Sequence, residues 1–188
     1  MRKLILLTLL ASMMVALTAG VAVAAVTDFR ETGTGTAELI SEEGCQNGGT
    51  CTDRVSGSVA GKPVDNPRMN ATEKRFAGIM GTVSSDFSQA GPGPTPGTYS
   101  VPTSGSVRLA DRDGGRIFLE IEGTTTGPQS GPNNATFEGT YTVTKGTGQF
   151  SNVKGGSGEA TFELTDPGTG EDSTFVASLD GTLRRSGR

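Results

Sequence analysis

The chain of 188 residues contains no histidine. This absence excludes Ser-His and Cys-His nucleophilic pairs and removes the commonest metal ligand. Two cysteines are present, and zinc sites are usually built from Cys and His ligands. Because both cysteines are expected to be bridged, the sequence predicts neither a metal site nor a cofactor. No set of catalytic residues is recognisable, so the catalytic residues of any enzyme here remain unknown.

Concentrated positive charge is also scarce. The chain has 16 Lys and Arg residues against 20 Asp and Glu residues, for a net charge of −4. The basic residues are scattered, apart from a cluster at residues 184–188. An acidic protein has no general electrostatic attraction for nucleic acid, so we expect no nucleic-acid partner. We interpret residues 184–188 as a disordered, solvated tail.

The N-terminus contains the only long apolar run. A basic start and a largely apolar stretch up to about Leu17 precede small residues that end at Ala24. This order is typical of a secretory signal peptide over residues 1–24, cleaved between Ala24 and Ala25. The apolar stretch is short for a membrane anchor, which needs roughly 20 residues. The sequence therefore predicts a secreted protein, extracellular or periplasmic, with no membrane association after cleavage.

Cys45 and Cys51 flank a glycine-rich segment, 47–49, that is typical of a tight hairpin turn. Export to an oxidising compartment predicts a disulfide between them. A redox pair is the alternative, but such pairs usually have Cys-x-x-Cys spacing. The spacer here is longer, which favours a disulfide that pins a hairpin.

The mature sequence has no sustained helical periodicity and many short alternating runs. They are residues 32–41, 50–61, 75–87, both arms of a hairpin within 104–126, 135–146, 158–166 and 173–183. Loops are expected at 61–74, 88–102 and 127–135. The later runs have one apolar face, as in half-buried antiparallel sheet. The sequence predicts a single all-β domain over residues 25–183, an antiparallel β-barrel of about eight strands, with a β-sandwich as the alternative.

The apolar faces of these runs supply the predicted ligand-lining residues of the barrel. They are Leu119, Ile121, Tyr141, Phe162, Phe175 and Leu179. Tyr141 differs from the others because it carries a hydroxyl on an apolar face, which needs a structural hydrogen bond or a ligand contact. The expected partner is a small apolar molecule.

Acidic residues are explained more simply by turns and solvent. Asp111 and Asp113 lie in a hairpin turn, where aspartate is favoured. Glu120 and Glu122 share the polar face of a strand and are expected to point to solvent. Asn70 and Asn134 match the glycosylation sequon, and the sequence alone does not establish whether either is used.

The stretch "GTGQFSNVKGGSG", residues 146–158, is unusually rich in glycine. A strand is expected on each side, so a bend at the end of the sheet is favoured, with Phe150 and Val153 anchored in the core. A phosphate-binding loop is the alternative, but it requires a following helix, and here a strand follows.

This segment carries a family resemblance. Residues 137–163 resemble the closing segment of the allene oxide cyclase barrel-like family, which includes plant dirigent proteins and many small secreted bacterial proteins. The matching positions are Tyr141, Val143, 146–148, Phe150, Val153, Gly156 and Gly158. The resemblance covers roughly residues 104–183. It implies an eight-stranded antiparallel barrel with an apolar lumen, often in homo-oligomers. Family members guide cyclisation or radical coupling of hydrophobic small molecules, and none of their catalytic residues maps onto this chain.

Three functions follow as hypotheses. The favoured one is a secreted, non-catalytic β-barrel that binds a small apolar molecule or acts as an extracellular accessory module. The second is an allene oxide cyclase-like or dirigent-like protein that guides cyclisation or coupling. The third is a structural or adhesive surface protein. The cyclase-like or dirigent-like hypothesis requires an open lumen. A lumen filled by the side chains of Leu119, Phe137, Phe162 and Phe175 would argue against it.

Overall fold

The protein is built almost entirely from β-strands, as the sequence predicts. The computed structural model describes residues 25–41, 49–59, 76–129, 134–165 and 173–186. The strands are β1 (Ala25–Ser41), β2 (Thr50–Val59), β3 (Gly78–Asp86), β4 (Gly91–Pro92), β5 (Thr98–Ala110), β6 (Arg116–Pro128), β7 (Ala135–Thr147), β8 (Val153–Thr165) and β9 (Ser173–Arg185). Two short 3-10 turns, η1 (Phe87–Gln89) and η2 (Gly148–Phe150), are the helical elements of this part of the chain. None of its helices is long and apolar enough to cross a membrane.

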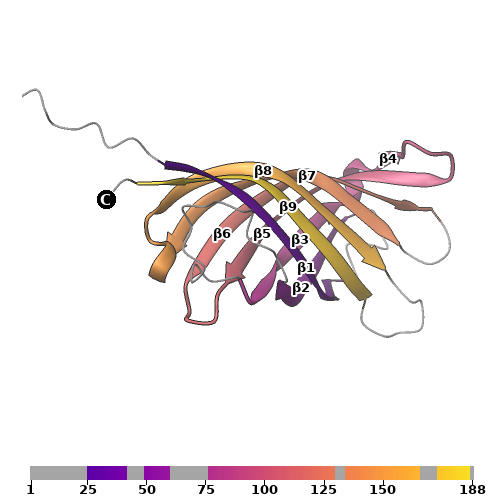
Figure 1. Ribbon diagram of the computed structural model, residues 1–188. Helices are drawn as coiled ribbons and strands as arrows, with labels where there is room; N and C mark the ends of the chain where they lie inside the picture. The colour runs from indigo at the N-terminus through magenta and orange to yellow at the C-terminus, as the bar shows by residue number, and fades with distance from the viewer. Residues whose placement is uncertain (1–24, 42–48, 60–75, 130–133, 166–172, 187–188) are drawn as a thin grey trace, which may run out of the picture.

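The strands form one antiparallel sheet in the order β3-β2-β1-β9-β8-β7-β6-β5-β4. An additional pairing joins β3 to β5, so eight strands form a ring and the short β4 lies outside it. Figure 1 shows the sheet strongly curled, with β1 in indigo beside β9 in yellow. The predicted antiparallel barrel is confirmed, and the β-sandwich alternative is not what the chain adopts.

Glycines on the inner face allow the strands to coil tightly. Gly123 pairs with Gly139, and Gly158 pairs with Gly181. A Cβ at any of these four positions would collide with a backbone carbonyl oxygen of the neighbouring strand. Glycine at such places permits the sharp bending that closure of a small barrel requires. Gly81 is similar, because a Cβ there would collide with the Ser106 carbonyl oxygen of β5, and β3 runs through it as one strand.

Some predicted boundaries differ from the observed ones. The loop expected over residues 88–102 ends earlier, because β5 begins at Thr98 and contains Pro102. Pro102 pairs with Thr124 of β6 on one side, and the pairing of β5 with β3 has already ended at Thr103. Proline is tolerated there because the strand has a free edge at this position.

The tail predicted to be disordered also contains ordered residues. Strand β9 continues to Arg185, and Arg184 pairs with Val26 of β1 and with Gly155 of β8. The backbone N–H of Ser186 then donates to Asn152. Residues 184–186 are therefore ordered because they find backbone partners in neighbouring strands.

The glycine-rich segment forms the bend that the sequence predicts. It runs from the end of β7 through η2 into β8, and Gly148 has φ of 60°. Phe150 and Val153 are both buried in the hydrophobic core. Their burial agrees with two apolar anchors at the end of the sheet. A strand follows this bend, whereas a phosphate-binding loop would be followed by a helix.

Several predictions fall outside the described residues. They concern the signal peptide 1–24 and its cleavage site, the loop 61–74 with Asn70, and Cys45. Cys51 lies in β2 opposite Ser85 of β3, but the disulfide stays a prediction because Cys45 is not described. Asn134 is described and exposed, and its glycosylation is still a prediction.

Candidate functional site

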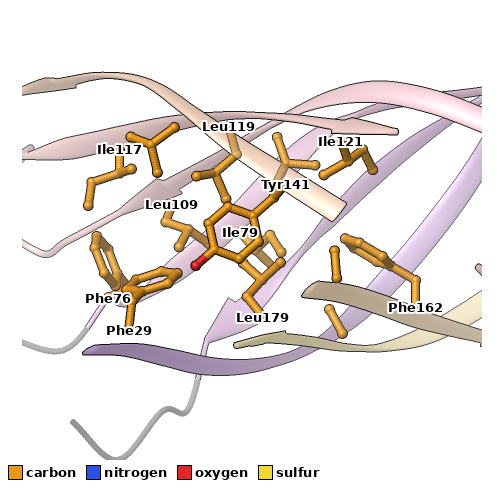
Figure 2. Close-up of a cluster of buried hydrophobic side chains, with 14 of the residues drawn as sticks. Phe29, Phe76, Ile79, Leu109, Ile117, Leu119, Ile121, Tyr141, Phe162 and Leu179 are labelled. Atoms are coloured by element: carbon orange, nitrogen blue, oxygen red, sulfur yellow. The ribbon is translucent and has the colours of Figure 1, made fainter. Parts of the chain in front are cut away.

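All six predicted lining residues lie in one buried cluster inside the sheet. They are Leu119, Ile121, Tyr141, Phe162, Phe175 and Leu179. Figure 2 shows that the cluster draws side chains from strands that face each other across the curled sheet, including Leu119 of β6 and Leu179 of β9. The structure thus places these residues together on the inner face. Their contact with a ligand stays a prediction.

One end of this cluster is filled by phenylalanine rings. The rings of Phe137 and Phe162 have centroids 5.7 Å apart in an edge-to-face arrangement. Phe162 also lies 6.2 Å from Phe175. All three side chains are buried, as is Leu119. These contacts form a packed apolar core on the inner face of β7, β8 and β9.

Tyr141 lies at the centre of the cluster and is fully buried. Its pairing partner on β8 is Gly158, which pairs in turn with Gly181 of β9. A Cβ at Gly158 would lie 2.7 Å from Cε1 of Tyr141, and one at Gly181 would lie 2.6 Å from its hydroxyl oxygen. The ring therefore lies across two glycines. Figure 2 shows its hydroxyl pointing toward Phe29 and Phe76.

The Tyr141 hydroxyl has no hydrogen-bond partner among the described residues. Burial raises the pKa of this phenol well above 10, and the Asp180 carboxylate adds to the rise. The backbone of Thr182 lowers the pKa in part, but its contact with the hydroxyl does not have the geometry of a hydrogen bond. An unpaired hydroxyl in an apolar interior usually costs about 1–3 kcal/mol. Within the described part of the chain, the structural hydrogen bond expected for Tyr141 is therefore missing.

Glu31 is a second buried polar group, and the sequence analysis missed it. It is 9% exposed, and its Oε2 atom is buried without a hydrogen-bond partner in the described part of the chain. Burial raises the pKa of its carboxyl from 4.5 to about 7. Its neighbour on β9 is the buried Leu179, so the carboxyl lies on the inner face. The available signal was its spacing of two from Phe29, which places both residues on one face of a strand.

One group of buried hydroxyls in the barrel interior is paired. Thr103 lies between Ser85 and Thr125, with Oγ–Oγ distances of 2.9 and 2.8 Å. The three hydroxyls thus form a short chain across β3, β5 and β6. This contrast matters because buried polar atoms in native proteins are nearly always paired. Glu31 and Tyr141 are exceptions within the same barrel.

The remaining acidic residues have structural explanations. The Asp111 carboxylate accepts hydrogen bonds from the backbone N–H groups of Asp113 at 2.9 Å and Gly115 at 2.7 Å. It also accepts one from the side-chain amide of Gln149, which ties the β5–β6 turn to η2. Glu120 and Glu122 are exposed, as predicted. No cluster suited to a metal ion occurs among the residues that the structure describes.

The arrangement offers hydrogen bonding rather than an evident reaction. Glu31 presents a carboxyl and Tyr141 a phenol, both surrounded by apolar side chains. Such groups fix the orientation of a bound molecule in an apolar site. No protein-family model and no curated protein match the chain. The functional argument therefore depends on the residues of the barrel itself.

Proposed function

We propose that this protein is a secreted, non-catalytic β-barrel that binds a small apolar molecule on the inner face of its sheet. The main observation is that the Oε2 atom of Glu31 and the hydroxyl of Tyr141 are buried among apolar side chains without a hydrogen-bond partner in the described part of the chain. Buried groups of this kind each lower stability unless a partner completes them. A ligand that is mostly apolar and carries a polar group would supply that partner.

Binding is favoured over catalysis by the chemistry of the same two groups. The pKa of Tyr141 is raised well above 10, so its phenol stays protonated and is a poor base near neutral pH. Within the described residues, no ionisable group is hydrogen-bonded to the buried Oε2 atom of Glu31 to act as its partner in acid-base work. The packed rings of Phe137, Phe162 and Phe175 also occupy space that a cyclase-like or dirigent-like reaction would need.

The wider setting belongs to the same proposal. Membership of the allene oxide cyclase barrel-like family, export by the segment 1–24, and assembly into homo-oligomers all rest on the sequence. The eight-stranded ring is compatible with the fold that the resemblance implies. Fold alone gives no activity, so the cyclisation or coupling chemistry of that family is not carried over.

Titration with the neutral fluorescent probe N-phenyl-1-naphthylamine tests this function. We expect saturable fluorescence enhancement with folded protein and none with urea-unfolded protein. Ala160→Leu adds bulk at a buried inner-face position beside Leu179, and we expect it to weaken probe binding. Thr161→Leu adds an apolar side chain at the next, exposed position and is the matched control.

Circular dichroism of both variants checks that each still folds, since extra bulk in a packed interior costs about 1–3 kcal/mol. Absence of saturable binding to the folded wild-type protein would contradict the proposal. Equal probe binding by both variants would place the probe elsewhere on the protein.

A further inference from the structure

Glu31 is the strongest unexplained group in the described part of the molecule. Its Oε2 atom is buried and unpaired, whereas the buried Asp111 carboxylate accepts backbone hydrogen bonds from Asp113 and Gly115. The two carboxyls thus differ in kind. Asp111 organises a turn, whereas the Oε2 atom of Glu31 has no hydrogen-bond donor in the described part of the chain.

The surroundings of Glu31 are apolar on the sides that the structure describes. Leu179 pairs with it from β9 and is 1% exposed. Phe29 precedes it on the same face of β1, and its ring lies edge-to-face to Tyr141 with centroids 5.8 Å apart. Alternate residues of a strand are about 7 Å apart, so the carboxyl and the Phe29–Tyr141 pair lie within the length of one small molecule.

The charge of the carboxyl restricts which polar group fits there. An ionised carboxylate accepts hydrogen bonds and cannot donate them. A ligand with an acidic head would bring a second negative charge into the same apolar site. A ligand with an amine head donates hydrogen bonds and, when protonated, forms charge-assisted ones that are roughly twice as strong as neutral ones.

We propose that Glu31 makes the inner face selective for apolar molecules that carry a primary amine. This inference rests on the binding function proposed above. The amine nitrogen donates to the carboxyl, and the hydrocarbon part contacts the inner apolar residues beside it. The raised pKa of Glu31, about 7, agrees with a site that lacks a positive partner of its own.

Competition against N-phenyl-1-naphthylamine tests this selectivity. Octylamine, octanol and octanoic acid share one chain length and differ in the head group. We expect octylamine to displace the probe at about one tenth of the octanol concentration, and octanoic acid to be the weakest competitor. In Glu31→Gln the advantage of octylamine over octanol should fall to about onefold. Asp28→Asn removes an exposed carboxylate from the same strand and should retain the wild-type preference.

The outcomes separate the two proposals. Equal displacement by octylamine and octanol in the wild-type protein, or a preference that persists in Glu31→Gln, overturns the assignment to Glu31 and leaves apolar binding intact. Failure of the probe to bind the folded protein overturns the binding function and this inference with it. Isothermal titration calorimetry with octylamine and Glu31→Gln checks the loss directly, and circular dichroism checks that the variant is folded.

Discussion

Tyr141 of β7 and Phe29 of β1 contact each other across two intervening strands. Their ring centroids are 5.8 Å apart and their planes meet at 70°. The row between them consists of Gly158 on β8 and Gly181 on β9, each paired with the next residue in the row. The two aromatic rings can therefore meet because no side chain separates them. This arrangement links the curvature of the sheet to the placement of the candidate site.

The first prediction concerns the glycines of this row. Gly158→Ala should lower the free energy of unfolding by at least about 3 kcal/mol, because its Cβ would collide with the Asp180 carbonyl oxygen and approach the Tyr141 ring. Gly155→Ala, on the same strand, meets only Arg184 at 4.0 Å and should change stability by less than about 1 kcal/mol. Urea denaturation of both variants measures the difference. Similar losses in the two would show that the tight coiling at Gly158 is not required.

The second prediction concerns the Tyr141 hydroxyl. Tyr141→Phe removes a buried oxygen that has no partner in the described part of the chain and leaves the ring in place. We expect the free energy of unfolding to stay the same or rise by up to about 1 kcal/mol. Chemical denaturation at neutral pH checks this. A loss of more than about 1 kcal/mol would mean that the hydroxyl is hydrogen-bonded in the folded protein, for instance through an ordered water.

The third prediction uses the paired hydroxyls as a contrast. Thr103→Val keeps the shape of a buried side chain but leaves Ser85 and Thr125 each without one partner. We expect a loss of about 1–3 kcal/mol in the free energy of unfolding. Thr142→Val, at an exposed strand position, is the control and should change it by less than about 0.5 kcal/mol. Equal effects of both substitutions on thermal denaturation would argue against a contribution from the hydroxyl chain.

The second half of the fold was predictable from the sequence because its inner face is apolar. Residues such as Ile117, Leu119 and Ile121 alternate with polar ones, and this period of two identifies a half-buried strand directly. Strand β1 gives no such signal. Its inner positions include Thr27, Glu31 and glycines, so the expected strand began at residue 32 although β1 starts at Ala25.

The candidate site was half predictable for a related reason. Tyr141 was found because a hydroxyl on an apolar face is visible within a single strand. Glu31 was missed because its burial depends on Leu179, which is far away in sequence and adjacent only after β1 pairs with β9. Long-range pairing therefore decides which polar residues enter the barrel. A local pattern cannot report it.

The last prediction concerns the pH dependence of stability that Glu31 causes. Burial raises the pKa of this carboxyl from 4.5 to about 7, so the folded protein binds its proton more tightly than the unfolded chain does. This contribution to stability is complete below the unfolded-state pKa of 4.5 and is lost as the pH rises through about 7. We expect a loss of about 2–3 kcal/mol between pH 5 and pH 8.

The Glu31→Gln variant isolates this effect from other carboxyls. Denaturation midpoints measured from pH 4 to pH 9 should show the wild-type protein losing stability relative to Glu31→Gln as the pH rises. Asp28→Asn, whose carboxylate is exposed on the same strand, should follow the wild-type curve. A difference between wild type and Glu31→Gln that stays constant with pH would mean that the carboxyl ionises equally well in the folded and unfolded states, and that Glu31 is not a desolvated group.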